Sequence, residues 1–218
     1  MRRVHHPSYG DAVHPNPAFR KTDEAEALGF ALARGFGVLS VNGPAGPLVA
    51  HVPLLLAPDA SHALIHLARS NAIALADLPA PAVFAVMGPD AYVSPDWYGA
   101  PDQVPTWNYV AVHLRGVPEP LPMESLRGMA DELAAEHEAR LAPKRPWISA
   151  KMSDGVMERM MRMILPFRLV IEEVTSTFKL NQNKTPEERQ GVIAALEAGP
   201  GEGGAAAIAR LMRGLKGV

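Results

Sequence analysis

Residues 104–116 read VPTWNYVAVHLRG, and this stretch decides the expected fold. Its second half alternates in the manner of a β-strand with one buried face. Its first half places Trp107, Asn108 and Tyr109 in a row after a proline, although aromatic residues make up only 6% of the chain. A buried Trp or Tyr needs a polar partner, so an ordinary apolar core has little use for such a stretch. The question is what this strand entrance borders.

Short β-branched and Leu-rich runs, separated by turns, lie on both sides of this stretch. Strands are predicted at 37–41, 47–57, 62–68, 82–88, 107–117 and 167–174. Residues 70–78 are predicted to form a short helix, and 90–106 a long loop rich in Pro and aromatic residues. Tight turns with few intervening helices favour an antiparallel barrel over a βαβ sheet. We therefore expect a mainly β fold with α (α+β), a small antiparallel β-barrel decorated by peripheral helices.

The expected helices follow from period and end signals. Thr22 caps a helix that closes at Arg34 and Gly35, and a change of period predicts further helices at 123–140 and 153–164. TPEERQGVIAALEAG begins another helix with proline at the first position. We expect a single domain over 1–198, with an N-terminal extension and inserted helices, followed by a Gly-rich hinge and a short helix over 199–218.

Composition excludes several classes of protein. The 218 residues include 21 basic and 23 acidic side chains, for a net charge of −2, so the chain is not a polycation built to coat nucleic acid. The absence of cysteine excludes disulfides, thiolate metal sites and a Cys nucleophile. No apolar run reaches the roughly 18 residues of a membrane span. We expect a cytoplasmic protein with no membrane partner.

Residues 92–109 hold five of the chain's 13 aromatic residues (3 Trp, 4 Tyr and 6 Phe), mixed with small polar side chains. Apolar walls with a few placed donors suit a flat, partly polar ligand. The alternative is that these aromatic residues only anchor a long loop onto the barrel.

Two polar segments follow strands. HLARSN (66–71) offers the guanidinium of Arg69, the hydroxyl of Ser70 and the amide of Asn71 at the expected start of a helix, a donor set that suits a phosphate. The alternative is an ordinary N-cap beside a solvated arginine. KLNQNK (179–184) either recognises an anion or ring edge, or is a polar turn before the next helix.

Other chemistries find little support. His62 and His66 are four residues apart on one strand face, roughly 13 Å, too far to share an ion, so no metal site is expected. The sequence contains no HExxH, GxSxG, GxGxxG or P-loop pattern. No catalytic residue can be assigned.

HLARSN, GPDAYVSPDWY, VPTWNYVAVHLRG and KLNQNK occur in this order and at spacings that resemble the PaiB-like family of FMN-binding negative transcriptional regulators. The resemblance covers about residues 14–198. The family pattern near the end is KLSQN, and Asn181 replaces its serine here.

The resemblance implies an FMN-binding split β-barrel, similar to pyridoxamine-phosphate oxidases and flavin reductases, that forms a homodimer with the flavin between subunits. Arg69, Ser70 and Asn71 would then contact the phosphate. The other implied cofactor contacts are His51, Val52 and Pro53 along the ring edge, His66 as a donor to the ring, Trp107 and Asn108 on the ring or the interface, and Lys179, Gln182 and Asn183 closing the site.

Three functions remain open at this point. The first is a regulator that represses gene expression through a flavin or related ligand, with DNA contact implied only by the family. The second is an FMN-dependent oxidoreductase, in which FMN carries the redox chemistry. The third is a barrel that has lost its cofactor and keeps only a structural dimer. The sequence shows no convincing helix-turn-helix, because its two C-terminal helices are joined by about seven residues rather than the usual 3–4.

Overall fold

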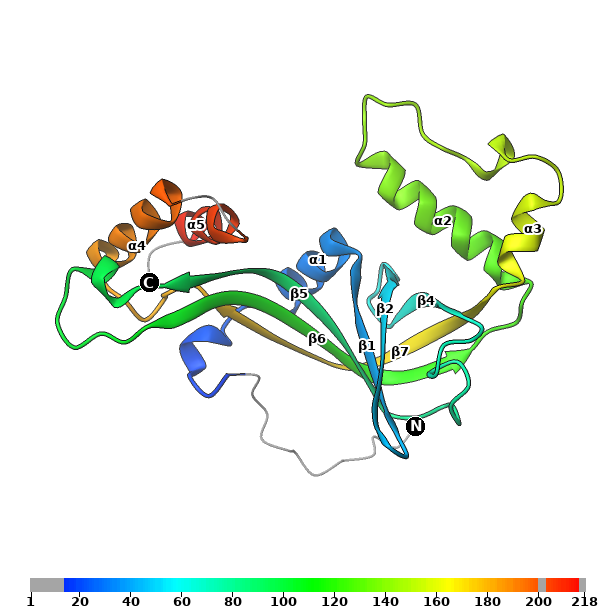
Figure 1. Ribbon diagram of the computed structural model, residues 1–218, viewed down its shortest axis with the longest axis horizontal. Coiled ribbons are helices and arrows are strands. Elements are labelled where there is room, and N and C mark those ends of the chain that lie inside the picture. Colours follow the sequence, from blue (N-terminus) through cyan, green and yellow to red (C-terminus); the bar gives the residue numbers. More distant parts are fainter. Residues whose placement is uncertain (1–13, 200–202, 216–218) are drawn as a thin grey trace. The chain divides into compact units, whose positions relative to one another are not determined.

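The computed structural model describes residues 14–199 and 203–215. The predicted N-terminal extension (1–13), the middle of the predicted hinge (200–202) and the last three residues lie outside the described residues. Seven strands form one sheet in the order β2-β1-β5-β6-β7-β4-β3 (Figure 1). They are β1 (Phe36–Gly43), β2 (Gly46–Pro53), β3 (Leu55–Leu56), β4 (His62–Ala68), β5 (Ala82–Val93), β6 (Thr106–Pro120) and β7 (Ile164–Lys179).

Pairing in the sheet is antiparallel in β1 with β2, β1 with β5, β3 with β4, and β4 with β7. β2 lies at one edge of the strand order and also contacts β4, which lies near the other edge. The sheet therefore curls upon itself. This architecture confirms the predicted antiparallel α+β class.

The helices are α1 (Glu24–Arg34), α2 (Ser125–Ala139), α3 (Val156–Met161), α4 (Pro186–Ala198) and α5 (Ala205–Gly214), with short 3₁₀ turns η1 (Pro17–Phe19), η2 (Pro95–Tyr98) and η3 (Ser149–Lys151). All the predicted long helices are present. The cap of α1 is Asp23 rather than Thr22, because the Asp23 carboxylate accepts the Glu26 N–H at 2.7 Å.

The chain divides into two compact units. Unit 1 comprises Met1–Ala27, Met87–Ala111 and Thr175–Val218, and unit 2 comprises Leu28–Val86 and Val112–Val174. The long strands β5, β6 and β7 contribute residues to both units.

The core of unit 2 is built from strand alternation. Leu39 and Val41 of β1 are buried, with their neighbours outside, and β4 buries Ala63, Ile65 and Leu67 in the same way. Such alternation is the pattern of a sheet with one covered face. At Gly116 the backbones of β6 and β7 meet so closely that a Cβ would lie 1.8 Å from the Val170 carbonyl oxygen.

Unit 1 places α4 and α5 against the ends of β5 and β6 (Figure 1). α4 begins with a capping box in which the Thr185 and Glu188 side chains each accept a backbone N–H of the other. It buries Val192, Ile193 and Leu196, while α5 buries Ile208, Ala209 and Met212.

Several predicted boundaries were wrong. The strand predicted at 167–174 extends over Ile164–Lys179, and the strand predicted at 47–57 is divided into β2 and β3. β5 continues to Val93 rather than ending at residue 88. Burial alternates over Ala82, Phe84 and Val86, is interrupted at 87–90, and resumes in the other phase at Ala91 and Val93. The predicted loop 90–106 is correspondingly shorter and contains η2. The helix predicted at 153–164 is confined to α3, because Ile164 already belongs to β7.

Candidate functional site

The segment after β4 carries the predicted phosphate donors Arg69, Ser70 and Asn71, all in unit 2. The helix predicted over 70–78 is wrong, since these residues form successive turns. The Asn71 side-chain oxygen accepts the Ile73 N–H at 2.9 Å, which offers that backbone group an alternative to a helix. Prolines at 79 and 81 follow too soon for a longer helix. A helix N-terminus therefore contributes nothing to anion binding here.

Arg69 itself is exposed and anchored at one side of its guanidinium. Its Nε donates to the Arg162 carbonyl oxygen at 3.0 Å, and an Nη lies 3.9 Å from the Met123 sulfur. Five N–H donors in a fixed fork leave others available for an anion. Ser70 is exposed beside it, so both residues are accessible from solvent.

A cavity of about 200 Å³ lies next to this segment. Met123, the residue that contacts Arg69, belongs to its wall. The full lining is Ala74, Ala76, Leu78, Pro120, Leu121, Met123, Leu165, Pro166 and Phe167. Its side chains are apolar, so the cavity offers dispersion contacts and no charge of its own.

The predicted ring-edge residues lie on β2 and β4, also in unit 2. His51 is exposed and Val52 is buried, as successive strand residues on opposite faces must be. Pro53 and His66 are partly buried, and burial lowers the pKa of His66. His66 is thus neutral at pH 7 and can offer either a donor or an acceptor. Within the described residues, no three His, Asp or Glu side chains gather in a way that could hold a metal ion.

Trp107 and Asn108 lie in unit 1, on opposite faces of β6. The Trp107 side chain is 55% exposed and its ring lies edge-on to Tyr92, with 6.2 Å between ring centroids. Tyr92 is 46% exposed and also meets Trp97 edge-on. Asn108 is fully buried. One flat ligand lying on one face of the strand therefore cannot contact both side chains.

Lys179 is the last residue of β7, and the residues that it contacts belong, like Lys179 itself, to unit 1. Its ammonium donates to the Thr106 hydroxyl and lies 5.9 Å from the centre of the Phe19 ring. Burial lowers the pKa of Lys179. Thr106 directly precedes Trp107, so the structure brings Lys179 to the same strand entrance.

Gln182 and Asn183 differ in their freedom to bind. The Gln182 side chain accepts the Leu180 N–H and donates to the Phe178 carbonyl oxygen, so both ends of its amide stabilise the turn. Asn183 is exposed. The alternative interpretation of KLNQNK as a polar turn therefore applies to Gln182.

Asn181 is a residue that sequence reasoning treated only as a departure from the family pattern. It is buried, adopts a left-handed φ of 61°, and accepts a hydrogen bond from the Tyr98 hydroxyl at 3.3 Å. Asn tolerates this conformation better than most residues, which was the available signal. It links the aromatic segment 92–109 to the segment after β7.

The buried polar atoms without a partner all lie in unit 1, as far as the described residues show. They are Asn108 Oδ1, Thr175 Oγ1, Thr177 Oγ1 and Asn181 Nδ2. Buried polar groups are normally paired, so each calls for an explanation such as a water or a bound ligand. In unit 2, taken by itself, the exposed donors of Arg69 and Ser70 have the chemistry that a phosphate requires.

Residues 13–173 match a protein family described as "Putative FMN-binding domain". The chain is also 29% identical, over 187 residues, to the protein of Bacillus subtilis (strain 168) named "Protease synthase and sporulation protein PAI 2". That match covers 82% of this chain and 86% of the Bacillus protein.

Solved structures share the fold at low identity. A conserved hypothetical protein from Mycobacterium tuberculosis aligns with a TM-score of 0.54, at 17% identity over 74% of this chain and 88% of that one. An FAD- and haem-binding protein from Mycobacterium smegmatis aligns at 0.53, 16% identity and 73% of both chains. The flavocytochrome Anf3 from Azotobacter vinelandii aligns at 0.51, 15% identity, 78% of this chain and 74% of that one. These likenesses support the split β-barrel fold.

Proposed function

We propose, because this chain belongs to the FMN-binding domain family, that it is a PaiB-like regulator that represses gene expression through bound flavin. FMN is the cofactor of this family. The observation that carries the proposal is the exposed, anchored guanidinium of Arg69 beside the Ser70 hydroxyl, at the end of a barrel strand. A dianionic phosphate is the part of FMN that such a donor set recognises.

The residues that would hold FMN on unit 2 are those already placed there. Arg69, Ser70 and Asn71 would bind the phosphate, and His66 would offer a neutral hydrogen-bonding group. His51, Val52 and Pro53 would supply strand contacts. FMN supplies one- or two-electron chemistry when bound, and the chain supplies position and electrostatics.

The regulatory half of the proposal draws on the Bacillus relative, whose name refers to protease synthesis and sporulation. The alternative is an FMN-dependent oxidoreductase.

A homodimer completes the proposal. Tyr92 and Trp107 expose about half of their surfaces and stack edge-on, which leaves an aromatic face on unit 1. Exposed apolar faces on single subunits commonly mark interfaces. A second copy of this chain is the proposed cover.

The experiment is a titration of purified protein with FMN, FAD and haem, followed by absorbance and flavin fluorescence. Saturable quenching near one FMN per subunit is expected. The FMN-loaded protein is then mixed with NADH or NADPH in air. Steady oxidation of the nicotinamide would favour the oxidoreductase, and no turnover together with repression of a reporter would favour the regulator. No quenching at tens of micromolar FMN would contradict both.

A further inference from the structure

The cavity of about 200 Å³ beside Arg69 has features of a ligand site in its own right. Its walls come from the turns after β4, from the end of β6 with the residues that follow it, and from the start of β7. All of its lining residues belong to unit 2. Two of them, Ala74 and Ala76, carry only a methyl group, which leaves the space open. The proposed function makes no use of this cavity.

Backbone hydrogen bonds hold the cavity walls in place. The Leu121 N–H donates to the Pro166 carbonyl oxygen at 3.0 Å, which ties the chain after β6 to β7. The Ala76 N–H donates to the Ile73 carbonyl oxygen at 3.1 Å, and the Ile73 side chain is fully buried. Ligand cavities in proteins are usually largely preformed, and this cavity meets that condition.

The lining favours an apolar ligand over water. Its side chains contain no nitrogen or oxygen, and the N–H groups of Leu121 and Ala76 in the wall are already used within the chain. A buried water needs about two to four polar partners, whereas an apolar cavity of about 150 Å³ can stay dry and take up benzene. A cavity of about 200 Å³ therefore suits an apolar body of about six to nine carbon atoms.

Arg69 supplies a positive charge at the wall of the cavity. One of its Nη atoms lies 3.9 Å from the sulfur of Met123, which lines the cavity. Its Nε donates to the Arg162 carbonyl oxygen, so the remaining donors are the N–H groups of the two Nη atoms. No ion pair to Arg69 occurs among the described residues. A guanidinium with free Nη donors is suited to a carboxylate.

We propose that this cavity binds a compact apolar monocarboxylate, with its hydrocarbon body against Met123, Phe167 and the two alanines and its carboxylate on Arg69. The binding itself goes beyond the proposed function, because it needs no flavin. Its consequence rests on the proposed function: if Arg69 also binds the FMN phosphate, the two anions need the same guanidinium. The carboxylate then competes with FMN.

This competition gives the protein a means of responding to a small organic acid. Two ligands that exclude each other lower each other's apparent affinity by the same factor. The apparent Kd for FMN about doubles when the acid is present at its own Kd, and it rises further in proportion to the acid. The protein therefore releases flavin as the acid accumulates.

The first measurement follows the Met123 methyl group by NMR in the wild-type full chain, with isotope-labelled methionine methyl groups and no FMN. Phenylacetate is the probe. Phenylacetamide lacks its charge and acetate lacks its apolar body, so these two are the controls. We expect phenylacetate to move the Met123 resonance saturably, through the ring current of its phenyl group, while the buried Met129 stays as a reference. Phenylacetamide should bind about ten- to a hundredfold more weakly, and acetate should have no effect. An unmoved Met123 resonance at millimolar phenylacetate, or equal affinity for the amide, would overturn the site.

The chain offers a matched pair of variants that separates this site from the FMN site. Ala76→Leu fills part of the cavity, whereas Ala72→Leu makes the same change at an exposed position of the same segment that does not line it. We expect Ala76→Leu to weaken phenylacetate about tenfold or more and to leave FMN binding unchanged. Ala72→Leu should alter neither. Equal phenylacetate affinity in the two variants would show that the ligand does not occupy the cavity.

Flavin fluorescence with increasing phenylacetate tests the competition. An apparent Kd for FMN that rises in proportion to the phenylacetate concentration is the expected result. An FMN affinity that saturating phenylacetate leaves unchanged would overturn the shared use of Arg69 and leave the proposed function intact. Absence of flavin quenching would instead contradict the proposed function, and the methyl titration alone then decides whether the carboxylate site exists.

Discussion

The side chain of Arg69 donates from Nε to the main-chain carbonyl of Arg162, 3.0 Å away, although 93 positions separate the two residues. The Arg69 backbone N–H also donates to the Met163 carbonyl oxygen at 2.8 Å. The end of β4 is therefore fixed to the chain just before β7, with the guanidinium oriented by a neutral acceptor. No carboxylate in the described residues pairs with it, so its charge remains available to an anion.

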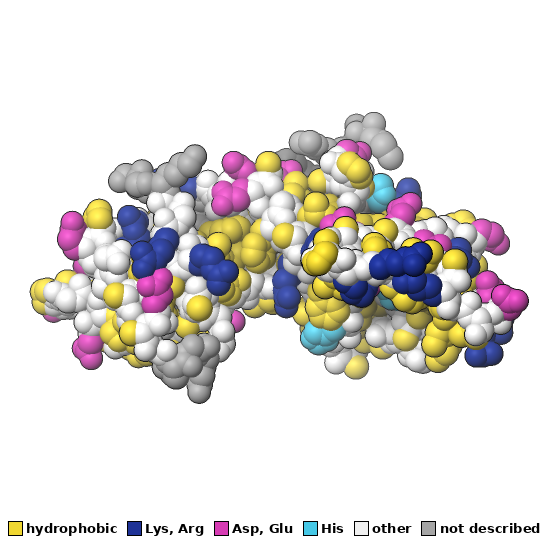
Figure 2. All heavy atoms as spheres, turned by 90° about the horizontal axis from the view of Figure 1, so that it is seen from above, with side chains coloured by type: hydrophobic (Ala, Val, Ile, Leu, Met, Phe, Trp, Pro, Cys, Tyr) yellow, Lys and Arg dark blue, Asp and Glu magenta, His cyan; other side chains and the backbone are white. Residues whose placement is uncertain are grey.

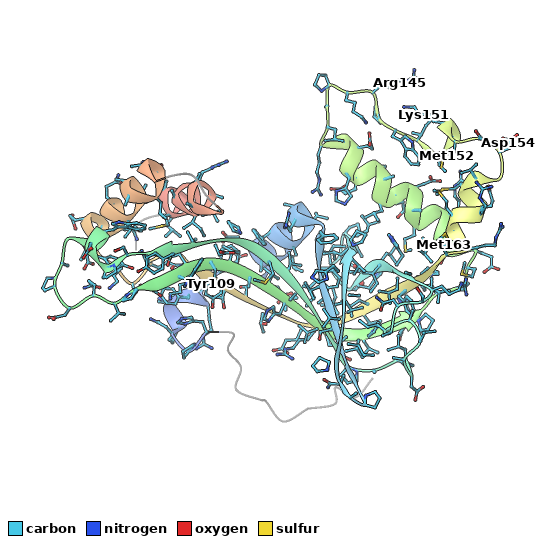
Figure 3. The ribbon with its side chains drawn as sticks, viewed as in Figure 1. Tyr109, Arg145, Lys151, Met152, Asp154 and Met163 are labelled. Carbon is cyan, nitrogen blue, oxygen red and sulfur yellow. The ribbon has the colours of Figure 1, made fainter. Side chains whose placement is uncertain are left out.

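Arg69→Ala is expected to weaken FMN far more than riboflavin, because riboflavin lacks the phosphate. A lost charge-assisted contact is worth roughly 1.5–3 kcal/mol, about ten- to a hundredfold in affinity. Arg69→Lys should recover only part of this loss, since a point charge cannot form the bidentate fork. Fluorescence titration of both ligands measures the ratio. Arg145→Ala, on the exposed segment between α2 and α3 (Figure 3), is the matched control. If Arg69→Ala leaves the ratio of the FMN affinity to the riboflavin affinity unchanged, Arg69 does not bind the phosphate and HLARSN has only a structural role.

Gly116→Ala is expected to destabilise the protein by about 3 kcal/mol, because its Cβ would lie 1.8 Å from the Val170 carbonyl oxygen and would force β6 and β7 apart. Urea denaturation measures the change. Gly128→Ala on α2 is the control, since nothing lies within 4 Å of its added methyl group and alanine favours a helix by about 0.5–1 kcal/mol. Equal stability of the two variants would disprove the close contact.

The free energy of unfolding of the apo protein is expected to fall as the pH drops from about 7 toward 5. Burial lowers the pKa of His66, and burial followed by the nearby Arg115 lowers that of His113. The unfolded chain therefore takes up protons first, below its ordinary histidine pKa of about 6.5. The stabilisation is complete above that value and is lost as the pH falls toward the folded-state pKa. A double His66→Gln and His113→Gln variant should show a shallower slope, with its pH 8 stability as the reference. If the variant's unfolding free energy depends on pH with the same slope as that of wild type, these histidines are not the cause of the pH dependence.

The aromatic face at Trp107 is expected to hold a homodimer together. Light scattering of wild type should give twice the subunit mass of 23.4 kDa, and Trp107→Ser should shift the mass toward a single subunit at micromolar concentration. Ile148→Ser is the control, because both side chains are 55% exposed. A monomeric mass for wild type would contradict the dimer. A dimeric mass for Trp107→Ser would show that the interface does not depend on Trp107.

The isolated protein is expected to bind DNA weakly and in a salt-sensitive manner. The net charge is −2, and on the face shown in Figure 2 the basic side chains form small groups separated by acidic and apolar ones. Phosphate contacts made by scattered cations lose affinity steeply as salt rises. Electrophoretic mobility shifts at 50 and 150 mM salt test this, with a scrambled duplex as the control. A nanomolar, sequence-specific shift at the higher salt would refute it.

The strands and helices whose signals lie within a few residues of one another in the chain could be predicted from the sequence. The alternation in β1 and β4 and the signals TPEE and Arg34-Gly35 define structure within a few residues, so periodicity and caps located them. Among helices, none in the described residues is long and apolar enough to cross a membrane. The helix predicted over 70–78 was the local prediction that failed, because these residues form turns. There the Asn71 side chain takes the Ile73 N–H that a helix would have used, and helical spacing in the sequence could not reveal that competition.

The two sides of β6 separate what the sequence determined from what the tertiary structure decided. A period of two already places Trp107 and Asn108 on opposite faces, whatever the rest of the chain does. Which face is open depends on α5, whose Met212 reaches Asn108 from 104 positions away. The Tyr98 hydroxyl likewise meets Asn181 across 83 positions. A strand's own residues specify its pleat, because that is a property of adjacent backbone bonds. The segment that packs over a strand face comes from a distant part of the chain. It packs there when burying its apolar side chains stabilises the fold by more than the unmade hydrogen bonds destabilise it, and only the folded chain shows for which segment this holds.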